Sequence, residues 1–159
     1  AFETVAGWGF VSVTPTGLRA VGWPGPAVAT AAPVSARAEI ASLVERLKRH
    51  WAGAPQRYDD VQLELSGVPP FHRAVYVAAR GLEVGHTCTY GELAVCLGVP
   101  GAARAVGQAL ARNPFPLVVP CHRVLAAGGR PGGFSAPGGL STKARLLEAE
   151  GVVLRLSGR

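Results

Sequence analysis

The sequence predicts an α+β protein: a small N-terminal α/β lobe with a three-stranded antiparallel sheet, then a mostly helical C-terminal lobe with a helix-turn-helix. Three observations support this fold class. Alternating apolar residues flank one helical pattern in the first 66 residues, helix-capping signals recur after residue 70, and "SGVPP" at 66–70 has a linker's composition. We therefore expect two domains, at residues 1–66 and 67–159.

The first lobe contains two strand patterns, a helix and a further strand pattern. "TVAGWGFVSV" and "LRAVGW" predict strands joined by a Pro/Gly turn at residues 14–17, and the Pro/Ala/Gly-rich segment 24–34 predicts a loop. A helix is expected to begin at Ser35. Its apolar residues recur at helical spacing at Ile40, Leu43, Val44, Leu47 and Trp51. "DDVQLEL", which ends at Leu65, alternates as a third strand would.

The second lobe begins with helix signals. Pro70 suits the first position of a helix through "FHRAVYVAARGL". Thr89 and Glu92 form a capping-box pattern, so a second helix should start at Tyr90 and end by Gly98. "GVPG" then predicts a tight turn before the next helix.

The next helix should run from Ala102 to about Arg112, where Asn113 and a proline end it. Two short helices around a glycine-containing turn are a helix-turn-helix candidate. Arg104 would face outward among small residues, which lets a backbone approach a DNA groove closely. An ordinary helical hairpin fits the same pattern equally well.

Three features follow this helix pair. "FPLVVP" at 115–120 predicts a short buried strand, and the glycine-rich segment 126–140 predicts either a mobile lid or a plain surface loop. A last helix, "KARLLEAE", should be capped by Ser141 or Thr142 and end at Gly151.

Charge is unevenly distributed along the chain. The net charge is +6, and residues 67–159 carry all of it because the first 66 residues hold equal numbers of acidic and basic side chains. A basic C-terminal lobe indicates a polyanionic partner, namely nucleic acid. An arginine bias of a GC-rich genome is the alternative.

The composition, 48% hydrophobic and 16% charged, is typical of a globular protein. No stretch reaches the roughly 20 apolar residues of a membrane span, and no secretory signal is visible. The three cysteines have neither CxxC nor CxxH spacing, so we expect no disulfide framework, no metal and a cytoplasmic, reducing setting.

Cys121 is the candidate nucleophile, because a thiolate needs a base and His122 follows directly. In an extended segment neighbouring side chains point to opposite sides, so a kink after Pro120 or a bridging water would have to couple the pair. Glu148 or Glu150 could orient the imidazole. The alternative, a buried inert cysteine, is equally compatible with the sequence.

The remaining cysteines and histidines have simpler interpretations. Cys88 and Cys96 fit core or near-surface positions. His50 follows "RLKR" at a helix end, where it would complement the helix dipole. His72 and His86 have no partners at ligand spacing, which predicts surface or local hydrogen-bonding roles.

An ordered set of motifs resembles a known family. "TYGELAVCLGVPGAARAVGQALARNPFPLVVPCHRVLAAGGRPGGFS" is similar to the O6-alkylguanine-DNA alkyltransferases, also called methylated-DNA–protein-cysteine methyltransferases. "RAVGxAL", "NP", "PCHRV" and "KxxLLxxEG" occur in the family's order and spacing, from about residue 70 to Gly151. The first 66 residues match only as a generic small α+β lobe.

The resemblance implies direct-reversal DNA repair. Cys121 would accept the alkyl group of O6-alkylguanine, or of O4-alkylthymine, irreversibly and once per molecule. His122 would act through a bridging water, oriented by Glu150. Asn113 would tie the turn before the active-site segment, and the Tyr90 hydroxyl would donate to the guanine.

The same resemblance implies a pocket for a flipped-out base. The carbonyls of Cys121 and Val124 would accept the guanine amino group, and the amide of Ser135 would meet O6. The remaining pocket residues implied are Leu110, Pro116 and Phe134.

DNA would be bound through the minor groove, with Arg104 filling the vacated base position. The other DNA-binding residues implied are Ala102, Ala103, Ala105, Gly107 and Tyr90. The partner would be double-stranded DNA containing O6-alkylguanine, bound by a monomer without a cofactor.

The chain departs from the family pattern at a few points. Phe134 stands where some relatives place a tyrosine, Gln108 replaces a common glycine, and the N-terminal zinc residues of some relatives are not recognisable. Three other classes compete: a non-catalytic reader of alkylated bases, a helix-turn-helix transcription factor and a Cys-His hydrolase. The small residues of 102–107 argue against a base-reading regulator, and Cys121 argues against a non-catalytic reader.

Overall fold

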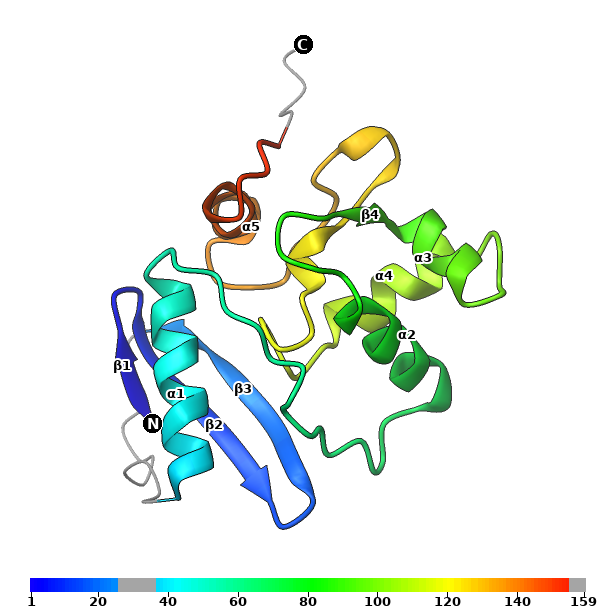
Figure 1. Ribbon diagram of the computed structural model, residues 1–159. Helices are drawn as coiled ribbons and strands as arrows, with labels where there is room; N and C mark the ends of the chain where they lie inside the picture. Colours follow the sequence, from blue (N-terminus) through cyan, green and yellow to red (C-terminus); the bar gives the residue numbers. More distant parts are fainter. Residues whose placement is uncertain (26–36, 155–159) are drawn as a thin grey trace.

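The N-terminal part of the chain is a three-stranded antiparallel sheet with a helix against it (Figure 1). The computed structural model describes residues 1–25 and 37–154. The sheet has the order β1-β2-β3, formed by β1 (Phe2–Thr4), β2 (Gly7–Thr14) and β3 (Gly17–Gly25). Helix α1 (Ala38–Trp51) buries its apolar stripe, and Trp51 meets Trp23 edge to face at 5.2 Å between ring centroids. Most of the loop predicted at 24–34 lies outside the described residues.

The sheet has three strands, but its third member is not the predicted one. Residues 61–65 form a single parallel bridge, Leu18 to Leu63. Its hydrogen bonds run from Leu18 N to Gln62 O and from Glu64 N to Leu18 O. The third strand of the sheet is instead β1, which was not predicted as a separate strand. It is separate because the predicted first strand is broken by a turn before Gly7, whose φ of 115° suits glycine.

The C-terminal part is mostly helical, as predicted. It contains α2 (Pro70–Arg80), β4 (Cys88–Thr89), α3 (Tyr90–Cys96), α4 (Ala103–Ala111) and the 3₁₀ turn η1 (Cys121–Arg123). Strand β5 (Val124–Leu125), the 3₁₀ turn η2 (Ala127–Gly129) and α5 (Gly139–Ala149) complete it. Strands β4 and β5 pair in parallel.

The predicted capping box at the start of α3 is confirmed. The Thr89 hydroxyl accepts from the Glu92 amide at 3.1 Å, and the Glu92 carboxylate accepts from the Thr89 amide at 2.6 Å. This reciprocal pair fixes the helix start at Tyr90, and α3 packs on α4 in a helix-turn-helix arrangement.

Segment 115–120 is not the predicted strand. It is a series of buried turns with one isolated bridge, Pro116 to Val119. Asn113 imposes this conformation: its Oδ1 accepts from the Phe115 amide at 2.9 Å and its Nδ2 donates to the Val119 carbonyl at 3.0 Å. The apolar run therefore reports burial and not strand pairing.

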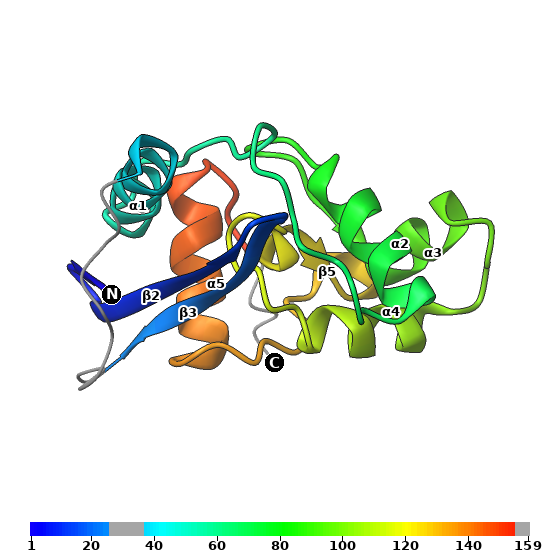
Figure 2. The same ribbon diagram turned by 90° about the horizontal axis from the view of Figure 1, so that it is seen from below.

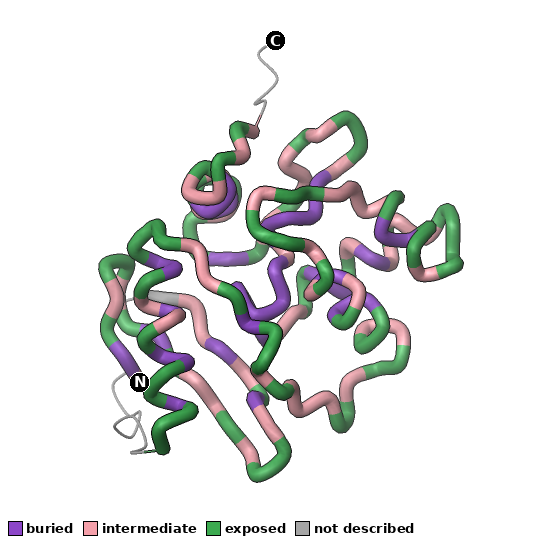
Figure 3. Tube along the Cα trace, viewed as in Figure 1, coloured by how far each residue is buried: buried purple, intermediate pink, exposed green. Residues whose placement is uncertain are grey.

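Helix α5 also begins earlier than predicted, at Gly139. Gly138, with φ of 81°, precedes it, and the Ser141 and Thr142 hydroxyls donate to carbonyls of the preceding turn instead of capping the helix. The core runs through both parts of the chain, and Figure 3 shows buried segments gathered where they meet. Across that junction the Val21 amide donates to the Pro114 carbonyl at 2.8 Å. The two-domain boundary at residue 66 stays a prediction.

Candidate active site

Cys121 opens the 3₁₀ turn η1, which Figure 2 shows beside α5. The preceding residue, Pro120, has φ of −79° and ψ of 66°, and its carbonyl accepts from the Arg123 amide at 2.9 Å. The chain is thus kinked after Pro120, so neighbouring side chains need not point to opposite sides. This turn places a partly buried Cys121 beside a fully buried His122.

Glu150 joins this turn through buried hydrogen bonds. Its Oε1 lies 2.8 Å from His122 Nε2, and Arg123 donates from Nε to Oε2 and from Nη2 to Oε1, both at 2.9 Å. The Glu150 and His122 side chains are 0% exposed. Arg123 is held in turn by the Leu82 carbonyl at 2.6 Å. Of the two predicted carboxylates, Glu150 meets the histidine and Glu148 is exposed.

Burial and hydrogen bonding set the charges of the network. Burial alone would raise the pKa of Glu150, but hydrogen bonds from His122 and Arg123, together with the nearby His50 N–H, outweigh it and lower that pKa. Burial lowers the pKa of His122 from 6.5 to about 4, against the opposing effect of Glu150. At neutral pH His122 is therefore neutral. Because a carboxylate only accepts, Nε2 carries the proton and Nδ1 keeps a lone pair.

The thiol of Cys121 is in its protonated form at neutral pH. Burial raises its pKa, while a hydrogen bond with Asn113 and the charge of Lys143 act in the opposite direction. His122 Nδ1 is buried and has no hydrogen-bond partner among the described residues. The pair therefore consists of a thiol that needs a base and an imidazole with a free basic nitrogen.

We expect acidification to destabilise the protein between pH 6.5 and about 4. His122 has a pKa of 6.5 when unfolded and about 4 when folded, so only the unfolded state takes up the proton in this window. Stability is fully present above pH 6.5 and falls as pH drops, by roughly 2 kcal/mol at pH 5. Urea denaturation at pH 7.5 and pH 5 measures this loss. His122→Gln should remove the histidine component, whereas the exposed His86→Gln should not; equal losses in all three proteins would contradict the assignment.

A cavity of about 550 Å³ opens beside Cys121, between α3, α4 and the segment 133–135. Seven residues predicted for substrate or DNA binding line it together with Cys121: Tyr90, Ala103, Arg104, Gly107, Leu110, Phe134 and Ser135. The predicted Ala102, Ala105, Pro116 and Val124 are not among its lining residues. Asn113 is not among the lining residues either, and its side chain ties the 113–119 turn that leads to Cys121.

Lys143 is a buried lysine that the sequence analysis missed. It is 0% exposed, its Nζ donates to the Val124 carbonyl at 2.6 Å, and burial lowers its pKa to about 8. Nζ also lies 5.9 Å from the Tyr90 ring and 5.6 Å from the Phe134 ring, so this cation stands behind two cavity walls. The sequence does contain a signal for this burial, because Lys143 lies at helical spacing from two buried leucines of α5.

His50 is the second missed residue. It is fully buried in the last turn of α1, with Nδ1 3.2 Å from the Tyr58 hydroxyl and Nε2 3.7 Å from Glu150 Oε1. His50 is among the basic residues in the last turn of α1, as predicted, but its side chain is buried against Glu150 and His122. The sequence signal for its burial is its position on the apolar stripe of α1, next to Trp51 and three residues after Leu47.

His50, His122 and Glu150 bring one potential metal-ligand atom each within 4.8 Å of one another. Both Glu150 oxygens, however, already accept from Arg123. A cation here would have to displace a guanidinium, so the arrangement has the chemistry of a hydrogen-bonded ion pair.

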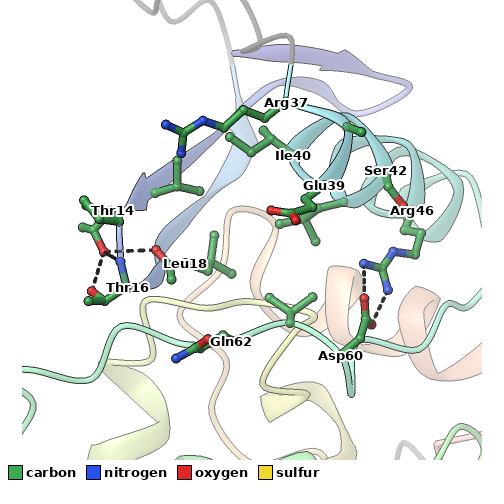
Figure 4. Close-up of a pocket in the computed structure, with 16 residues that line it drawn as sticks. Thr14, Thr16, Leu18, Arg37, Glu39, Ile40, Ser42, Arg46, Asp60 and Gln62 are labelled. Atoms are coloured by element: carbon green, nitrogen blue, oxygen red, sulfur yellow. Dashed lines mark hydrogen bonds and ion pairs between the residues drawn. The ribbon is translucent and has the colours of Figure 1, made fainter.

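A second cavity, of about 660 Å³, lies between the β2–β3 hairpin and α1 (Figure 4). An Arg46–Asp60 ion pair of 2.7 Å crosses one side of it. None of the residues predicted to carry chemistry lines this cavity. Among the described residues, no helix has the length and apolar character needed to cross a membrane.

A sequence model described as "6-O-methylguanine DNA methyltransferase, DNA binding domain" matches residues 70–152. The chain belongs to this family. The matched segment runs from α2 through α5 and contains Cys121, His122 and Glu150, so the family's DNA-binding domain coincides with the hydrogen-bonded network and its cavity.

Relatives within the 6-O-methylguanine DNA methyltransferase family include two bacterial proteins of similar identity. The methylated-DNA–protein-cysteine methyltransferase of Mycolicibacterium paratuberculosis is 44% identical over 111 residues, 70% of this chain and 65% of that protein. The protein of that name from Salmonella typhimurium is 42% identical over 112 residues, 70% of this chain and 64% of its own length. The matched part thus spans slightly less than two thirds of these relatives.

Solved structures of family members extend the likeness to the N-terminal part. Mycobacterium tuberculosis OGT in complex with DNA has a TM-score of 0.73 and 31% identity, covering 94% of this chain and 89% of that one. An O6-methylguanine DNA methyltransferase from Methanococcus jannaschii has a TM-score of 0.70 and 30% identity, covering 99% and 94%. The α+β fold predicted from the sequence is confirmed.

Proposed function

We propose that this protein is a methylated-DNA–protein-cysteine methyltransferase that moves the alkyl group of O6-alkylguanine in DNA irreversibly onto Cys121. The supporting observation is the thiol at the wall of an open cavity, beside a neutral His122 that a buried Glu150 holds through Nε2. This arrangement leaves the basic nitrogen of His122 available to the thiol. O4-alkylthymine is the second substrate to test.

The reaction would be a direct displacement. His122 Nδ1 takes the Cys121 proton through a water molecule, and Sγ attacks the alkyl carbon as its bond to guanine O6 breaks. The bonding electrons leave with guanine, which takes a proton from the Tyr90 hydroxyl. The proton that His122 removed from Cys121 then returns the Tyr90 phenolate to its neutral form. The amide of Ser135 would stabilise charge on O6. The product is a thioether that nothing in the chain can cleave, so each molecule acts once and needs no cofactor.

The guanine would be held by carbonyls as well as donors. Val124 O already accepts from Lys143, and a carbonyl has a second lone pair for the guanine amino group. The Cys121 carbonyl would accept beside it. Leu110 and Phe134 would supply apolar walls, and the buried Pro116 would support the cavity from behind.

The target atom is hidden in a duplex, so the nucleotide would be flipped into the cavity. Helix α4 would enter the minor groove, where Arg104, which is exposed at the cavity rim, takes the place of the flipped base. The small residues that allow this approach are Ala102, Ala103, Ala105 and Gly107. Because such binding relies on phosphate contacts, it should weaken as salt rises.

Arg104→Ala should slow repair of a duplex lesion on the order of tenfold or more while changing reaction with free O6-benzylguanine little. The free base needs no flipping, so only the duplex reaction uses the arginine. Single-turnover rates on both substrates measure the difference. Arg145→Ala, which removes an exposed arginine of α5, is the matched control. Equal losses of rate on the two substrates would contradict the proposal that Arg104 takes the place of the flipped base.

The experiment that tests the proposal is mass spectrometry after incubation with a duplex that contains one O6-methylguanine. A single methyl group on the Cys121 peptide, saturating at one per protein, is the expected result. Tight lesion binding without a mass change would indicate a non-catalytic reader. If the protein neither binds the lesion nor takes up the methyl group, the proposal is refuted and a Cys-His hydrolase is favoured.

A further inference from the structure

His50 belongs to the N-terminal part of the chain but reaches the buried network around Cys121. It lies in the last turn of α1, and its side chain is 0% exposed. Its ring stands edge to face with that of His122, 6.0 Å between centroids at 86°. Its Nε2 lies 3.7 Å from Glu150 Oε1, the oxygen that also holds His122.

The hydrogen bonds of His50 define its tautomer. The backbone N–H of Gln56, which can only donate, points at Nδ1 from 3.4 Å, so Nδ1 is an acceptor. The Tyr58 hydroxyl, 3.2 Å from the same nitrogen, then also donates to it. In the neutral imidazole the proton must therefore be on Nε2.

That Nε2–H has no hydrogen-bond partner among the described residues, and Glu150 Oε1 is the carboxylate oxygen near it. A separation of 3.7 Å is too long for a hydrogen bond. Between two buried side chains it is still an attractive contact between an N–H dipole and a negative oxygen. A parallel Tyr58 ring, 5.8 Å away at 7°, holds the His50 ring in this orientation.

We propose that His50 is a positioning residue for alkyl transfer. It bounds the Glu150–His122 pair on the side of α1: its N–H attracts Oε1 and its ring edge limits tilting of His122. Arg123 fixes the same carboxylate through its guanidinium. The N-terminal helix thus takes part in setting the reactivity of Cys121. This inference rests on the proposed transferase function.

Two substitutions separate positioning from packing. His50→Gln keeps an N–H near the position of Nε2, whereas His50→Leu fills the site without a donor. We expect His50→Leu to lower the single-turnover transfer rate about tenfold or more, as loss of a group that orients a functional histidine does. His50→Gln should recover the rate to within about threefold. DNA affinity should be unchanged in both, because His50 does not line the cavity.

Val44→Ala is the matched packing control, since Val44 is buried on the same helix and no hydrogen bond links it to the network. It should lower the melting temperature but leave the transfer rate unchanged. A wild-type rate in His50→Leu, a Gln variant as slow as the Leu variant, or an equal rate loss in Val44→Ala would each overturn the proposal. Absence of transfer by the wild-type protein would instead refute the transferase function.

Discussion

Cys121→Ser is expected to abolish alkyl transfer, with a fall in rate on the order of 10⁶, the scale seen when a catalytic nucleophile is removed. A serine hydroxyl is far less acidic than a thiol, and a neutral His122 is too weak a base to generate its alkoxide. The hydroxyl is also smaller than the thiol, so the cavity and its DNA-facing rim stay intact. Single-turnover assays with a methylated duplex and fluorescence anisotropy measure rate and affinity separately.

The chain supplies two control cysteines for this experiment. Cys96 is exposed on α3, and burial raises the pKa of Cys88 to about 11, so neither has the setting of a nucleophile. Cys96→Ser and Cys88→Ser should transfer the methyl group as the wild-type protein does. Methyl transfer by the Cys121→Ser protein, or loss of lesion binding without loss of folding, would show that this cysteine has a different role.

The parts of the fold that followed from sequence are those fixed by local chemistry. The start of α3 was predictable because Thr89 and Glu92 satisfy each other's backbone donors within four residues. The 115–120 segment was not, because its conformation depends on the Asn113 amide bonding to both ends of the turn. Alternating or continuous apolar residues indicate burial, and burial alone does not distinguish a strand from a packed loop.

The site divides in the same way. Cys121 and His122 are adjacent in sequence and were identified from it, whereas the choice of Glu150 over Glu148 depends on which carboxylate α5 turns toward η1. Sequence reasoning placed His50 correctly at a helix end but missed its burial, which requires the other half of the molecule. The burial of Lys143 was missed for the same reason, since its hydrogen-bond acceptor is a backbone carbonyl of β5.

Glu150→Gln should destabilise the protein by about 3–5 kcal/mol, because removing one charge of a buried pair leaves the other uncompensated. Arg123 would keep its guanidinium among the same buried groups but face a neutral amide in place of a carboxylate. The measurement is the free energy of unfolding in urea at pH 7.5. Glu148→Gln is the matched control, since Glu148 is exposed on the same helix and should change stability little. A loss below about 1 kcal/mol would contradict the expectation that Arg123 is left as an uncompensated buried charge.

The same substitution should slow transfer on the order of 10³–10⁴-fold in the fraction that stays folded. The glutamine amide can donate to His122 Nε2, which a carboxylate cannot do, and this favours the tautomer with its proton on Nδ1. The nitrogen that should receive the Cys121 proton would then already carry one. Single-turnover rates at a temperature where the variant is folded test this directly. A near-normal rate would mean that Glu150 serves stability alone and that the thiol loses its proton by another route.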